Sequence, residues 1–125
     1  MIKKNIPFDF IFDHLIKSQI EVKPMFGFFA VYSYGKIILV LRQRADKQAL
    51  NGIWVAVDPQ HLSSIKTDYP SLIDLPIVEG SRLKKSTWLM INEFANDFEE
   101  IAIKLCNLIE SNDLRIGHRV KTLNV

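Results

Sequence analysis

The predicted strands of this sequence are apolar on both faces, and this pattern limits the folds that the chain can adopt. The pattern covers four segments, 23–32, 36–44, 52–57 and 86–92. In the third of these, Ile53 and Val55 point one way while Trp54 and Ala56 point the other way. A sheet with one face in water normally alternates apolar and polar residues. We therefore expect both faces of this sheet to be covered.

Three covers are possible for the second face: helices of the same chain, a second subunit, or a bound partner. Apolar patches larger than a few hundred Å² seldom stay exposed on a monomer. Symmetric homodimers are the commonest assemblies of soluble proteins, so the pattern favours a homodimer and leaves a protein partner as an alternative. The side chains predicted at this interface are Phe26, Phe28, Phe29, Trp54, Trp88 and Met90.

The other segments predict helices and turns around these strands. Phe8, Ile11, Phe12 and Leu15 recur at helical spacing, which predicts a helix over 7–17. Asp58 and Pro59 have the chemistry of a helix start, so a short helix is expected to run to about residue 67. Pro76 makes 71–79 an edge strand or no strand. Ser33-Tyr34-Gly35 predicts a hairpin turn.

The last predicted helix starts at Asn96, which forms a capping-box-like pair with Glu99, and ends near Asn112. The expected order is helix, three strands, helix, two strands, helix. This order is typical of a two-layer α+β fold with an antiparallel sheet. The 125 residues suit one domain, 1–125, whose final segment 114–125 we interpret as a tail.

Composition favours a cytoplasmic protein. Cys106 is the only cysteine, so no disulfide can form within the chain, which is typical of a reducing compartment. The longest unbroken apolar run, 37–41, is far too short to cross a bilayer. The net charge of +2 gives no overall field that would require nucleic acid or an anionic membrane as a partner.

No residue pattern points to catalysis, and we predict neither an enzyme nor a bound metal or cofactor. His14, His61 and His118 lie far apart without metal-ligand spacing. Cys106 lies beside the apolar stripe of the last helix, where cysteine acts as a small core residue. The five glycines form no phosphate-binding motif. A small-ligand pocket rests on the aromatic rings alone, and such rings are more often core.

Nucleic-acid binding is the alternative function, because basic residues cluster locally. Arg42 and Arg44 lie at a predicted strand end, Lys84 and Lys85 precede Trp88, and Arg119 lies in the predicted tail. Cations beside an aromatic ring could combine phosphate contact with base stacking. Cations at strand ends also protect sheet edges and keep proteins in solution. The small net charge favours this second interpretation and limits the first to weak binding.

Several segments resemble the N-terminal domain of the TfoX/Sxy competence-regulator family. The resemblance lies in Met25-Phe26-Gly27, the turn 34–36, the strand 54–58 that ends in an acidic residue, the Trp88 strand, and the Glu-rich helix that follows Asn96. It covers about residues 20–112. The element order is also similar to that of YjbR-like domains and secretion chaperones, and the chaperones are dimers. The resemblance implies a non-enzymatic regulator and supplies no catalytic residues.

Overall fold

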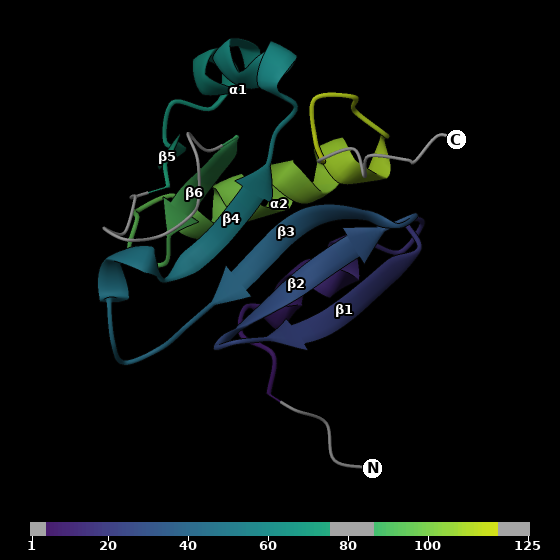
Figure 1. The fold of residues 1–125 in the computed structure, drawn as a ribbon. Helices are drawn as coiled ribbons and strands as arrows, with labels where there is room; N and C mark the ends of the chain where they lie inside the picture. The colour runs from purple at the N-terminus through teal and green to yellow at the C-terminus, as the bar shows by residue number, and fades with distance from the viewer. Residues whose placement is uncertain (1–4, 76–86, 118–125) are drawn as a thin grey trace.

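The computed structural model describes residues 5–75 and 87–117, which form one antiparallel sheet with helices against it (Figure 1). The strands are β1 (Ile20–Met25), β2 (Phe28–Ser33), β3 (Lys36–Arg42), β4 (Gly52–Ala56), β5 (Ile73–Asp74) and β6 (Trp88–Asn92). The α-helices are α1 (Leu62–Asp68) and α2 (Phe98–Glu110), and the 3-10 helices are η1 (Asp9–His14), η2 (Gln48–Leu50) and η3 (Pro59–His61). The predicted α+β class with an antiparallel sheet is confirmed.

The six strands follow the order β1-β2-β3-β4-β6-β5. Every pair is antiparallel, and β6 lies between β4 and the two-residue strand β5. The register places Val40 of β3 opposite Trp54 of β4, and Trp54 opposite Met90 of β6. Residues opposite one another share a face of the sheet, so this row fixes which side chains lie together.

The sheet has one strand more than the sequence indicates, because the segment predicted as a single strand over 23–32 is a hairpin. β1 and β2 pair from Ile20 opposite Ser33 to Met25 opposite Phe28, and the chain reverses at Phe26 and Gly27. Gly27 has a φ of 83°, a left-handed conformation that glycine adopts without strain. Continuous apolar residues across the turn hide this reversal in the sequence.

The main core lies between one face of the sheet and the helices η1 and α2, which Figure 1 shows together behind the strands. α2 presents an apolar stripe to the sheet, made of Ile101, Ala102, Leu105, Cys106 and Ile109, all buried. The opposing sheet residues are also buried: Val31, Leu39, Leu41, Ile53, Val55, Leu89 and Ile91. α1 adds Ile65 to the same core. We call this side of the sheet the inner face.

Two helix starts differ from their predictions. The first helix is a six-residue 3-10 helix over Asp9–His14 rather than a helix over 7–17, and it begins after Phe8, which has a left-handed φ of 58° that a right-handed helix does not contain. The predicted cap at Asn96 is wrong: Asp97 occupies the N-cap position of α2 and makes no side-chain cap. The carboxylate of Asp97 instead accepts a hydrogen bond from the Ser71 hydroxyl.

Other predicted boundaries are confirmed. Asp58 caps η3 by accepting a hydrogen bond from the Gln60 N–H at 3.0 Å, and Pro59 follows it. β5 lies at an edge of the sheet, which is one of the two alternatives predicted for 71–79, and Pro76 lies outside the described residues. Within the described ranges, no helix is long and apolar enough to cross a membrane.

The first part of the predicted tail belongs to the fold. Ile116 is buried and forms a bridge with Val57, and the Gly117 N–H donates to the Ala56 carbonyl at 2.8 Å. The Arg115 guanidinium donates to the carboxylates of Asp113 and Asp68, and the Arg115 hydrogen bond holds the pKa of the Asp113 carboxyl below its usual value. These contacts exclude a tail before residue 118, and residues 118–125 lie outside the described structure.

The carboxylate of Glu110 ties the end of α2 to the start of the sheet. It accepts hydrogen bonds from the Ser18 hydroxyl at 2.6 Å, from the Ser18 N–H at 2.8 Å and from the Lys17 N–H at 2.9 Å. The hydrogen bond from the Ser18 hydroxyl is the largest cause that lowers the pKa of the Glu110 carboxyl, and the two backbone N–H donors lower it further. The connection between η1 and β1 is thereby fixed against α2.

Candidate docking face

The sheet face opposite η1 and α2, which we call the outer face, carries a row of three aromatic rings. The centroids of Phe28 and Trp54 are 5.7 Å apart, and those of Trp54 and Trp88 are 6.4 Å apart, the latter pair edge to face. We call these three residues the aromatic strip. In Figure 1, α2 lies behind the sheet and α1 lies beyond the end of β4, so neither α-helix of the described ranges covers the outer side of β2 and β4. All three side chains are half-buried, so each ring retains contact with solvent.

A small second core lies under the two tryptophans and covers part of the outer face. It contains Leu50, Leu75 and Met90, all buried, with the rings of Trp54 and Trp88 packed against them. The Trp54 indole N–H donates to the Leu50 carbonyl at 2.9 Å, which fixes the ring. The chain's own loops therefore provide some of the cover that the apolar pattern requires.

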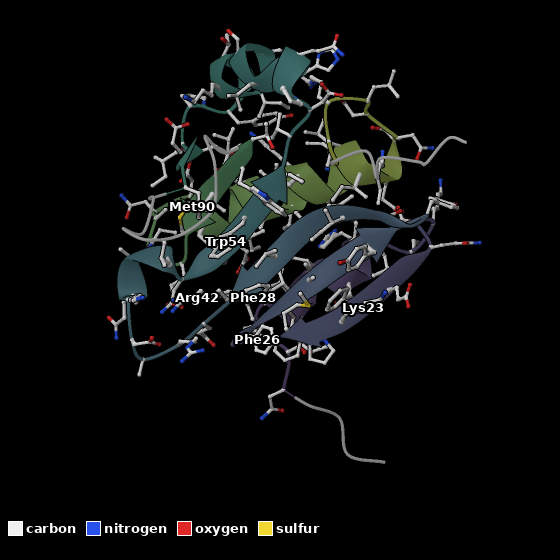
Figure 2. The ribbon with its side chains drawn as sticks, viewed as in Figure 1. Lys23, Phe26, Phe28, Arg42, Trp54 and Met90 are labelled. Atoms are coloured by element: carbon white, nitrogen blue, oxygen red, sulfur yellow. The ribbon has the colours of Figure 1, made fainter. Side chains whose placement is uncertain are left out.

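The turn between β1 and β2 extends the apolar surface to the end of the sheet. Phe26 is 95% exposed, and Met25, opposite Phe28 in the register, is 44% exposed. Figure 2 shows Phe26, Phe28, Trp54 and Met90 along one diagonal of the outer face. Burial of such a ring against another surface would be favourable, so the turn is a candidate contact point.

A polar network holds the loop between β3 and β4, which supplies Leu50 to the second core. Arg42 is 6% exposed, and its guanidinium donates to the Asn51 side-chain oxygen at 2.7 Å and to the Lys47 carbonyl at 3.0 Å. The Asn51 amide in turn donates to the Arg44 carbonyl at 2.7 Å. These hydrogen bonds satisfy two backbone carbonyls of the loop and hold the loop in one conformation. The tryptophans therefore pack against a fixed support.

The structure separates the predicted interface residues by face. Phe28, Trp54 and Trp88 share the outer face, while Phe29 points to the inner face and packs against the main core. Consecutive strand residues point to opposite faces, so Phe28 and Phe29 cannot serve one surface. Met90 lies on the outer face but is fully buried under the rings. Three residues that were not predicted also contribute to this surface, namely Met25, Leu50 and Leu75. Of these, only Met25 could have been found from the sequence, because it precedes the predicted Phe26.

The predicted nucleic-acid residues are placed differently from one another. Arg42 is buried with its donors used inside the loop, so its guanidinium is closed to a phosphate. Arg44 is exposed and pairs with Asp46 at 2.8 Å, and this hydrogen bond lowers the pKa of the Asp46 carboxyl. Lys84, Lys85 and Arg119 lie outside the described residues. Binding of nucleic acid stays a prediction that rests on the remaining residues.

A cleft of about 800 Å³ lies on the inner side, between η1 and the ends of β1, β2 and β3. Residues of η1 and of the segment before it, 5–7, form one wall, and residues of the sheet form the other. Its apolar lining residues are Ile6, Pro7, Phe12, Val22, Pro24, Phe29 and Leu41. None of Phe26, Trp54 and Trp88 is among its lining residues, so the cleft is not the pocket suggested by the aromatic content.

The described residues contain no group of three His, Cys, Asp or Glu side chains placed to hold a metal ion. Cys106 is buried, its thiol lies 3.7 Å from the Ile11 carbonyl, and burial raises its pKa to about 12. A thiol becomes a strong nucleophile only as the thiolate. This environment fits a small core residue.

We expect Cys106 to be unreactive in the folded protein. Because burial raises the thiol pKa, the group stays protonated at pH 8, and the surrounding core also blocks access to the sulfur. An aromatic disulfide reagent at pH 8 should react with less than about a tenth of the thiol over an hour in the folded protein, and with all of it at once in denaturant. Rapid reaction in the folded protein would contradict the structure.

Comparison with models of known families, with curated proteins and with solved structures finds no match for this chain.

Proposed function

We propose that this protein is a non-enzymatic interaction module of the cytoplasm that binds a protein partner through the aromatic strip and the exposed turn at Phe26. The observation that carries the proposal is the 95% exposure of Phe26 at the end of a row of partly exposed rings. Large aromatic residues in a pre-formed patch supply most of the binding energy of protein interfaces. The resemblance to the TfoX/Sxy family adds a regulatory role to this proposal.

The surface favours a protein over nucleic acid. Trp54 and Trp88 meet edge to face and rest on the second core, so one ring partly blocks the other from stacking on a base. The ammonium of Lys23, an exposed cation of the outer face, lies 5.0 Å from the Tyr32 ring centroid, and the carboxylate of Glu21 on the same face of β1 offsets its charge. An apolar centre with few charges is typical of a protein interface.

The proposal is tested by replacing Phe26 with serine. Partners are first captured from a lysate on the immobilised chain, and the captured protein is then purified and titrated by calorimetry. We expect Phe26→Ser to weaken binding about tenfold or more, because an anchoring ring is worth above ~1.4 kcal/mol. Since Phe26 is almost fully exposed, the substitution should leave the fold unchanged.

Phe94→Ser is the matched control. Phe94 is 70% exposed in the connection between β6 and α2, so this variant removes another largely exposed ring outside the proposed surface. The control should bind within about twofold of the wild type. Equal affinities for the wild type and Phe26→Ser, or equal losses for both variants, would overturn the proposal.

A further inference from the structure

β1 is a long, open edge of the sheet. It has six residues and ends the strand order, while β5 at the other edge has only two. Figure 1 shows the outer side of β1 without a neighbouring strand or helix. Glu21, Lys23, Pro24 and Met25 are all exposed. Such an edge offers unpaired backbone groups to another strand.

Pro24 indicates which backbone groups face this edge. It has no N–H to give to β2, so its nitrogen fits the free side of the strand. Backbone groups alternate between the two sides of an antiparallel strand. The N–H and C=O groups of Val22 and Ile20 therefore point to the free edge as well, and Pro24 contributes its carbonyl alone.

The charges on β1 are complementary to those of an antiparallel copy of the same strand. Glu21 and Lys23 are two residues apart, so both side chains lie on the outer face. In an antiparallel pair of β1 strands centred on Val22, Glu21 of each chain lies opposite Lys23 of the other. Centring the pair on Glu21 or on Lys23 would place like charges opposite each other, and a shift by one residue would exchange the two faces. Among the registers centred on Glu21, Val22 and Lys23, the charges therefore select the one centred on Val22.

We infer that β1 pairs with β1 of a second copy of this chain, antiparallel about a twofold axis at Val22. Val22 then exchanges backbone hydrogen bonds with its own copy, and each Ile20 N–H donates to the Pro24 carbonyl of the other chain. On the inner side, the half-buried side chain of Val22 meets its copy, and that of Ile20 lies opposite Pro24 of the other chain. The two sheets become continuous, and both aromatic strips lie on the same side of the dimer.

Pro24 sets a limit on this contact. Because it lacks an N–H, the Ile20 carbonyl of the other chain receives no bond from it. Each end of the pairing is therefore weaker than its centre, where the two Glu21–Lys23 pairs flank Val22. The dimer should consequently depend strongly on those charges, which makes it open to a charge-exchange experiment.

The test measures the dimer dissociation constant of the full chain by sedimentation equilibrium. Lys23→Glu and Glu21→Lys each place like charges across the axis, and we expect each to weaken the dimer at least tenfold. The double variant, Glu21→Lys with Lys23→Glu, restores opposite charges with the wild-type net charge and should dimerise within about threefold of the wild type. Lys47→Glu, an equal charge change in the loop between β3 and β4, should have no effect.

The inference is wrong if the wild type is a monomer, if the single variants dimerise like the wild type, or if the double variant dimerises as weakly as the single variants. The inference does not rest on the proposed function, and Phe26→Ser separates the two. That variant should leave the dimer intact; if it dissociates the dimer, the second copy occupies the aromatic strip and the β1 contact is wrong.

Discussion

Substitution of Gly52 by alanine is expected to destabilise the protein by about 3 kcal/mol or more, the range of a strained backbone combined with a clash. Gly52 has a φ of 145°, and a Cβ at this position would lie 2.1 Å from the Ile91 carbonyl oxygen. The obstacle is backbone in the neighbouring strand β6, which cannot rotate away. Pairing of β4 with β6 beside the second core should therefore be lost.

Gly35→Ala is the matched control for this prediction. Gly35 also has a positive φ, 78°, but a Cβ there would meet no atom within 4 Å. Only the backbone strain remains, and we expect the free energy of unfolding to fall by about 1 kcal/mol. Urea unfolding followed by circular dichroism measures both variants. Equal losses for Gly35→Ala and Gly52→Ala would show that the close approach to Ile91 has no cost.

Substitution of Arg42 by alanine is expected to cost about 2–4 kcal/mol, because it leaves several acceptors of the loop between β3 and β4 without their donor. The Asn51 side-chain oxygen and the Lys47 carbonyl both lose a bond from the guanidinium. The same loop holds Leu50 against Trp54. We therefore also expect the tryptophan fluorescence of the folded variant to shift towards the red as water reaches the ring.

Arg44→Ala is the control for Arg42. Arg44 is basic and two residues away, but its side chain is exposed and its ion pair with Asp46 lies in solvent. Exposed ion pairs of this kind contribute little to stability, so the free energy of unfolding should change by no more than about 0.5 kcal/mol. If Arg44→Ala destabilises as much as Arg42→Ala, charge in the loop rather than the buried network supports the structure.

The sequence predicts most of the fold because the informative residues act locally. The apolar stripe of α2 and the Asp58-Pro59 start are short-range patterns whose physical cause is the same in any protein. The hairpin at Phe26 and Gly27 escapes prediction because apolar residues continue through the turn. The late start of η1 follows from the left-handed Phe8, whose ring centroid lies 5.0 Å from that of Phe98, a contact between distant segments.

The candidate surface is predicted less completely than the fold. The apolar strands predict rings on both faces of the sheet, and the structure places Phe28 on the outer face and Phe29 against the main core. Arg42 is as basic as Arg44 in the sequence, but the position of Asn51 determines that only Arg42 is buried. Such tertiary partners cannot be read from a single segment.

The buried thiol of Cys106 has a practical consequence for spectroscopy. The chain has one cysteine, and the core encloses it. A cysteine introduced at an exposed position would therefore be the single reactive group of the native protein, with no need to remove Cys106 and leave a cavity beside Leu105. Spin labels or fluorophores attached in this way could report distances between chains in an otherwise unaltered molecule.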